Sequence, residues 1–120
     1  MFTIDSIVLY VENVDLSKDF YADIFNCEPQ MLSPTFALVE FASNVNLTLK
    51  QAADLTPASN IRGGGTELSI SVTDKGTFDA LYQAWKSKGV EFAQPPVELV
   101  FGISFVAIDP DGHRIRVFTR

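Results

Sequence analysis

The sequence has only one cysteine, Cys27, and one histidine, His113, among its 120 residues. A single cysteine cannot form an internal disulfide, which favours a reducing compartment, and the cytoplasm is the expected location. We expect Cys27 to be a partly buried, inert thiol, because it directly follows a predicted helix. A single imidazole also leaves the serines without a plausible general base, so no nucleophilic catalytic site is predicted.

Basic residues are few as well: nine Lys and Arg stand against 15 Asp and Glu, for a net charge of −6 and a pI near 4.5. An acidic surface repels polyanions, and no basic run offsets that repulsion. No apolar run approaches the roughly 20 residues that span a bilayer. The first five residues lack the basic region and apolar core of a signal peptide. Nucleic acid and membrane are therefore not expected partners.

Apolar residues, in contrast, are plentiful enough for a core. They make up 47% of the chain and include ten Phe residues. A chain of this length fits one domain, since two domains would each be too small to build an adequate interior. We therefore predict a single domain over residues 1–120.

Two stretches show the same order of elements, strand–helix–strand–strand–strand. Apolar residues at alternating spacing predict the strands, and apolar residues at helical spacing predict the helix, in both stretches. The first set has strands at 2–11, 30–32, 36–42 and 45–50, and a helix at 15–25 with Asp15 as its N-cap. The second set has strands at 66–73, 91–93, 103–108 and 113–119, and a helix at 77–88 that ends at Gly89.

The segment between the two sets contains no periodic pattern and ends in three consecutive glycines, which is typical of a linker. Module one is therefore predicted at about 1–51, the linker at about 52–64 and module two at about 65–120. The predicted fold class is α+β, with two βαβββ modules that arise from an internal duplication of architecture.

In each module the strands carry apolar residues on the face expected to receive the helix. The opposite face carries polar side chains, namely Ser6, Asn46, Thr48, Glu67, Ser69, Arg114 and Arg116. Antiparallel sheets often have one solvated face, so these residues are compatible with an ordinary surface. They are equally compatible with the wall of a polar cleft, and the pattern leaves both interpretations open.

Several segments resemble one known family. They are residues 4–11, the helix segment Asp19-Phe20-Tyr21, residues 36–49, the pair Phe101-Gly102 and the turn Asp109-Pro110-Asp111-Gly112 with the strand after it. Together they resemble the vicinal oxygen chelate superfamily, which includes glyoxalase I, bleomycin-resistance proteins and extradiol dioxygenases. The resemblance covers nearly the whole chain. It implies a curved, eight-stranded mixed sheet with helices on its convex side.

The metal-dependent members of that superfamily hold a divalent ion with His, Gln and Glu side chains on the first and last strands of the two modules. The matching positions here are Ser6, Asn46, Glu67 and Arg116. Only Glu67 is a good ligand, and a guanidinium ~4 Å from a dication would be repelled by roughly 8 kcal/mol at an effective dielectric of about 20. We therefore expect no metal and no other cofactor. His113, beside the turn, is expected at the surface.

The metal-free members of the superfamily, the bleomycin-resistance-type proteins, bind a drug in a groove and are commonly homodimers. The resemblance thus implies a homodimeric protein that binds a small organic molecule, such as a toxic or antibiotic natural product, without metal. No catalytic residue is assigned. The expected ligand-binding residues are Ser6, Tyr10, Asn46, Thr48, Glu67, Ser69, Phe101, Arg116 and Phe118.

Three questions stay open: the function, the location of three aromatic side chains and the role of one ion pair. The chain is also compatible with a lyase, isomerase or dioxygenase of the same superfamily whose site has been rebuilt, and with a protein–protein module without a ligand. Tyr10, Phe101 and Phe118 are compatible with a pocket wall or with the core. Finally, Glu67 and Arg116 are predicted to form a direct or water-bridged ion pair. This pair either only stabilises the sheet or also presents the Arg116 edge to an anionic or carbonyl-bearing ligand.

Overall fold

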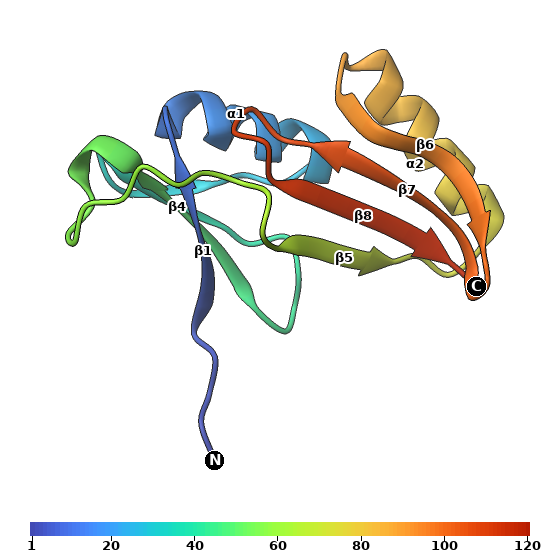
Figure 1. The fold of residues 1–120 in the computed structure, drawn as a ribbon, viewed down its shortest axis with the longest axis horizontal. Coiled ribbons are helices and arrows are strands. Elements are labelled where there is room, and N and C mark those ends of the chain that lie inside the picture. The colour runs from blue at the N-terminus through green and yellow to red at the C-terminus, as the bar shows by residue number, and fades with distance from the viewer. The chain divides into compact units, whose positions relative to one another are not determined.

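The computed structural model describes all residues, Met1–Arg120, and divides into two compact units, Met1–Gly63 and Gly64–Arg120. Each unit contains one strand, one long helix and three further strands in that order (Figure 1). The α+β class and the two βαβββ modules are therefore confirmed. The eight strands are hydrogen-bonded as two four-stranded mixed sheets, one in each module.

Module one has a sheet whose strands follow the order β1-β4-β3-β2. The first and last strands of the module pair in parallel, and the other neighbours pair antiparallel. Its elements are β1 (Ser6–Val11), α1 (Val14–Phe25), β2 (Gln30–Ser33), β3 (Phe36–Val39), β4 (Asn46–Gln51) and the short 3₁₀ helix η1 (Ala52–Asp54).

Helix α1 covers one face of this sheet and packs against β3 and β4. Every second residue of the strands points toward the helix, as the alternation of apolar residues predicts. The buried residues of this core are Leu9, Val11, Val14, Tyr21, Ile24, Ala37, Val39, Leu47 and Leu49. The other face of the sheet is left for polar and half-buried side chains.

Module two repeats the arrangement with the strand order β5-β8-β7-β6, in which β5 and β8 are parallel. Its elements are β5 (Glu67–Ser71), α2 (Lys75–Ser87), β6 (Glu91–Leu99), β7 (Gly102–Ile108) and β8 (Arg114–Thr119). Strand β6 continues well beyond the predicted 91–93. It can include Pro95 and Pro96 because it is an edge strand, and its register shifts between Phe92 and Val97.

The core of module two is built around Phe105 of β7. Four aromatic rings have their centroids 5.2–5.7 Å from that of Phe105, and they belong to Phe78, Tyr82, Trp85 and Phe92. Three of the four lie on α2. Tyr82 and Trp85 therefore contribute to this aromatic core.

Both long helices are capped by side chains at their N-termini. Asn13 accepts a hydrogen bond from the backbone N–H of Leu16 (3.0 Å), so the predicted cap at Asp15 was wrong by two residues. Asn13 has the extended backbone that a cap requires, whereas Asp15 lies in the first turn, where its charge suits the helix dipole. Asp74 caps α2 through the N–H of Thr77 (2.7 Å), and this hydrogen bond lowers the pKa of Asp74. Neither helix is long and apolar enough to cross a membrane.

The turn between β7 and β8 buries its histidine, which was expected at the surface. His113 is buried (7% exposed), and its Nδ1 lies 2.7 Å from Asp109 Oδ2, so the predicted surface position was wrong. The other carboxylate oxygen of Asp109 accepts hydrogen bonds from the N–H groups of Asp111 (2.9 Å) and His113 (2.8 Å). The carboxylate is thus held inside the turn, and the imidazole is buried because it packs against that carboxylate.

Candidate functional site

The face of module two opposite α2 brings together all the predicted binding residues of that module. Register places Ser69 of β5 opposite Arg116 of β8, and Phe118 opposite Ser104 of β7. All of these side chains point to the same side of the sheet, because residues two apart on a strand share a face. We call this surface the Arg116 face, and it consists of Glu67, Ser69, Phe101, Ser104, Arg116 and Phe118.

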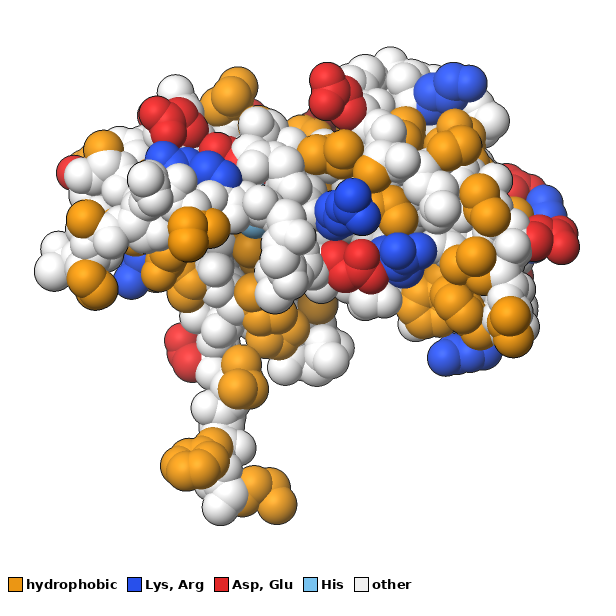
Figure 2. Space-filling model, in the orientation of Figure 1, with side chains coloured by type: hydrophobic (Ala, Val, Ile, Leu, Met, Phe, Trp, Pro, Cys, Tyr) orange, Lys and Arg blue, Asp and Glu red, His pale blue; other side chains and the backbone are white.

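The predicted ion pair between Glu67 and Arg116 is present. Arg116 Nε donates to Glu67 Oε1 at 2.8 Å, and the two side chains are 24% and 34% exposed. The contact is diagonal, since Glu67 lies opposite Arg114 in the register. Figure 2 shows acidic and basic side chains next to one another over β5 and β8. A half-exposed pair of this kind contributes about 0–1 kcal/mol, so its presence alone does not stabilise the sheet strongly.

Ser104 is a member of this face that was absent from the predicted binding residues. Its hydroxyl accepts a hydrogen bond from Arg116 Nη1 at 2.8 Å, and the residue is fully buried. The signal was the alternation in β7, which places Ser104 on the side opposite Phe105. Because Glu67 accepts a hydrogen bond from Nε and Ser104 accepts one from Nη1, the plane of the guanidinium is fixed. The Nη2 edge then remains for a ligand.

Two of the three predicted aromatic contacts lie together. The rings of Phe101 and Phe118 meet edge to face, with centroids 5.6 Å apart and an interplanar angle of 89°. Phe101 is exposed in the turn between β6 and β7, and Phe118 is half-buried with the Arg120 guanidinium 5.2 Å from its ring centroid. The third aromatic residue, Tyr10, belongs to module one and is exposed there. The Arg116 face therefore joins a fixed cation to an accessible aromatic pair.

The open face of module one carries the other predicted residues. Ser6 and Asn46 are register partners at the beginning of β1 and β4, and both are half-buried. Thr48 is 4% exposed, and its Oγ1 has no hydrogen-bond partner within the protein. Its neighbours across the sheet are Val8 and Leu38. This face thus combines polar side chains with half-buried and exposed apolar ones, and the oxygens of Ser6, Asn46 and Thr48 on it are neutral.

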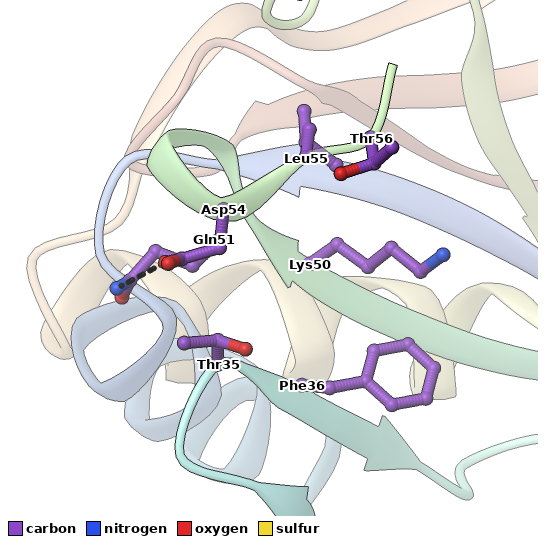
Figure 3. Close-up of a pocket in the computed structure, with 7 residues that line it drawn as sticks. All are labelled: Thr35, Phe36, Lys50, Gln51, Asp54, Leu55 and Thr56. Carbon is purple, nitrogen blue, oxygen red and sulfur yellow. Dashed lines mark hydrogen bonds between the residues drawn. The ribbon is translucent and has the colours of Figure 1, made fainter. Parts of the chain in front are cut away.

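A cavity of about 230 Å³ lies at the opposite end of β4 from Asn46 (Figure 3). It is formed where η1 and the chain after it return beside the end of β4 and the beginning of β3. The lining residues are Thr35, Phe36, Lys50, Gln51, Asp54, Leu55 and Thr56. None of them was among the predicted binding residues, although the alternation of β4 places Lys50 on the same face as Asn46 and Thr48.

The residues at the four positions that hold the metal in metal-dependent relatives do not fit a divalent ion. Ser6 and Asn46 offer only weak neutral oxygens, and the one carboxylate, Glu67, accepts a hydrogen bond from Arg116. No group of three or more His, Cys, Asp or Glu side chains in the structure could hold a metal. Of the four residues, only Glu67 is therefore of a type that binds a divalent ion well, and its carboxylate is engaged by Arg116.

Comparison with known proteins assigns the chain to one superfamily. The family model for the Glyoxalase/Bleomycin resistance protein/Dioxygenase superfamily matches residues 3–117. A curated relative from Enterobacter agglomerans, the phenazine antibiotic resistance protein EhpR, is 31% identical over 113 residues, which are 92% of this chain and 86% of the relative.

Solved structures share the fold. Protein ATC0852 from Agrobacterium tumefaciens is 36% identical, with a TM-score of 0.87 over 99% of this chain and 98% of that protein. A glyoxalase-related enzyme from Fulvimarina pelagi shares the fold at 18% identity, with a TM-score of 0.86 over 100% of this chain and 89% of that enzyme. The two βαβββ modules, the family-model match and these relatives together show that the chain belongs to the Glyoxalase/Bleomycin resistance protein/Dioxygenase superfamily.

Proposed function

We propose that this protein binds a planar aromatic antibiotic on the Arg116 face, without a metal, and sequesters it. The observation that carries the proposal is the Arg116 guanidinium at a position where metal-dependent relatives place a ligand, held by Glu67 and Ser104. The curated relative named for resistance to a phenazine antibiotic supports the class of ligand.

The geometry suits such a ligand in two ways. Aromatic rings supply a large contact area and favour stacked or edge-to-face partners, which Phe101 and Phe118 provide. The fixed Nη2 edge of Arg116 is a donor for a carbonyl or carboxylate oxygen. Sequestration breaks no bond in the ligand, so this function needs no electrophile and no general base. The number of antibiotic molecules neutralised would then equal the number of binding sites.

The first prediction concerns Arg116→Met, which keeps the apolar stem of the side chain and removes its charge. We expect the variant to bind phenazine-1-carboxylate about 10- to 100-fold more weakly than the unchanged protein, since a hydrogen bond to a charged group contributes about 1.5–3 kcal/mol. Isothermal titration calorimetry measures the affinity. Glu67→Gln should bind the carboxylate as well or a few-fold better, because a negative charge beside Arg116 has been removed.

Arg114→Met is the matched control, because it removes an equal charge from the same strand and the same face. It should change the affinity less than threefold. An equal loss in the Arg114 and Arg116 variants would show general electrostatic attraction rather than a site. No binding of phenazine-1-carboxylate or of uncharged phenazine to the unchanged protein at millimolar concentration would contradict the proposed function.

A second prediction concerns metal content and assembly, which native mass spectrometry of freshly purified protein reports together. We expect a homodimer, since β1 and β5 leave sheet edges that a second copy could cover, and no stoichiometric Zn, Ni, Fe or Mn. About one metal per chain that is lost in Glu67→Ala would favour an enzyme of the superfamily instead. A spectrum showing only monomer at tens of micromolar would contradict the dimer.

A further inference from the structure

The cavity of module one contains a cation and an aromatic ring side by side. Figure 3 shows the side chains of Lys50, on β4, and Phe36, on β3, extending in the same direction from adjacent strands. Lys50 Nζ lies 5.5 Å from the centroid of the Phe36 ring, which is a cation–π distance. A ligand that enters the cavity therefore meets a positive charge and an aromatic surface together.

The charge of Lys50 is not neutralised by a carboxylate within the chain. The acidic side chain in the cavity wall, Asp54, accepts a hydrogen bond from Gln51 Nε2 at 3.3 Å. Gln51 is in turn fixed, because its Oε1 accepts a hydrogen bond from the N–H of Val14 (3.2 Å). In Figure 3 this Gln51–Asp54 pair lies at the other end of the cavity from the Lys50 ammonium. The ammonium group is therefore available to an anion although the chain as a whole is acidic.

The cation lies in an aromatic row. Lys50 is the register partner of Phe36 on one side and of Tyr10 on the other, so the three residues follow one another across β3, β4 and β1. Tyr10 is 37% exposed, and its ring is accessible beside the cavity. A flat ring can thus contact apolar surface on either side of the charge, while its anionic group contacts Lys50.

We propose that module one holds a second binding site, lined by residues of module one alone, for a small aromatic carboxylate. The carboxylate contacts the Lys50 ammonium and the ring packs against Phe36. The volume of about 230 Å³ is below the 300–1,000 Å³ of pockets for drug-sized ligands, so the site takes a molecule of one or two rings. This proposal does not rest on the function proposed for the Arg116 face.

The test is to titrate the full chain with 2-naphthoate and, for comparison, with the uncharged 2-naphthamide. Calorimetry measures the affinities, and amide chemical shifts locate the site. We expect Lys50→Met to weaken 2-naphthoate binding at least tenfold and Lys50→Arg to retain it within threefold. The binding of 2-naphthamide should be weak and equal in all variants. The shifts caused by 2-naphthoate should be largest at Thr35, Phe36 and Gln51.

Lys86→Met is the matched control, because Lys86 also lies over an aromatic ring, 6.0 Å from the Tyr82 centroid, but on α2 and outside the cavity. It should leave binding unchanged. Repeating the titration in Arg116→Met distinguishes the two sites, because this variant leaves Lys50 unchanged. Binding of 2-naphthoate to module one should persist in Arg116→Met, even if the Arg116 face proves to have no ligand. Three results would each overturn the proposal: an affinity of Lys50→Met equal to that of the unchanged protein, equal losses of affinity in Lys50→Met and Lys86→Met, or no 2-naphthoate binding at millimolar concentration.

Discussion

Asp109→Ala is expected to lower the free energy of unfolding by about 3–4 kcal/mol. The buried carboxylate accepts hydrogen bonds from two backbone N–H groups, those of Asp111 and His113, and also contacts the imidazole of His113. Removing it leaves these donors inside the turn without their acceptor, at about 1–3 kcal/mol for each unsatisfied group. Urea denaturation, followed by circular dichroism, measures the change.

Asp109→Asn is the informative companion, because the amide oxygen can still accept the two backbone hydrogen bonds. It should cost only about 1 kcal/mol, which is the scale of one ordinary hydrogen bond. Asp79→Ala removes a carboxylate from an exposed i,i+4 pair with Lys75 and serves as the surface control, with an expected change below about 0.5 kcal/mol. If Asp109→Ala changed stability no more than Asp79→Ala, the turn would not depend on the carboxylate.

Gly102→Ala is expected to destabilise the protein by about 3 kcal/mol. Gly102 begins β7 with φ at +146°, and a Cβ built there would clash with the carbonyl oxygen of Thr119 and lie 2.9 Å from Cα of Arg120. Both contacts are with backbone, so a side-chain rotation cannot relieve them. The backbone of β8 must move or the glycine must change conformation, and each option costs about 1–3 kcal/mol.

The control for this substitution is Gly65→Ala. No atom lies within 4 Å of the position that a Cβ would take at Gly65, so stability should change by less than about 0.5 kcal/mol or rise slightly, since alanine restricts the unfolded chain. Thermal unfolding of the two variants side by side compares them. Equal midpoints would mean that the approach of Gly102 to Thr119 is easily relaxed.

Much of the fold could be predicted from the sequence, because alternation and helical spacing are local properties. The alternation in β4 and β8 was strong enough to assign both the strand and the face of each residue. Strand β6 was predicted too short, since Pro95 and Pro96 are evidence against a strand unless its edge position is known. His113 was misplaced for a similar reason: a polar residue beside a turn is usually exposed, and only the position of the Asp109 carboxylate shows that it is not.

The candidate site could be predicted in part. The Glu67–Arg116 pair could be predicted because both residues lie on the polar face, on strands that this fold places side by side. Ser104 was missed because the alternation in β7 gives only its face, and the role of a single hydroxyl in an apolar strand follows only from its contact with Arg116. The cavity beside Lys50 was missed because it depends on how residues 52–56 return toward the sheet, and that segment has no periodic pattern.

The parallel pairing of the first and last strands of each module also bears on the order in which the chain can fold during synthesis. Ser6 pairs with Asn46, and Glu67 pairs with Arg114, so the first strand of each module has to wait for the last one. Contacts between residues so far apart in sequence form late and slowly. The sheet of module one can close on the ribosome before module two exists. Strand β5, with Leu68 and Ile70 turned toward its future core, stays unpaired until β8 has emerged.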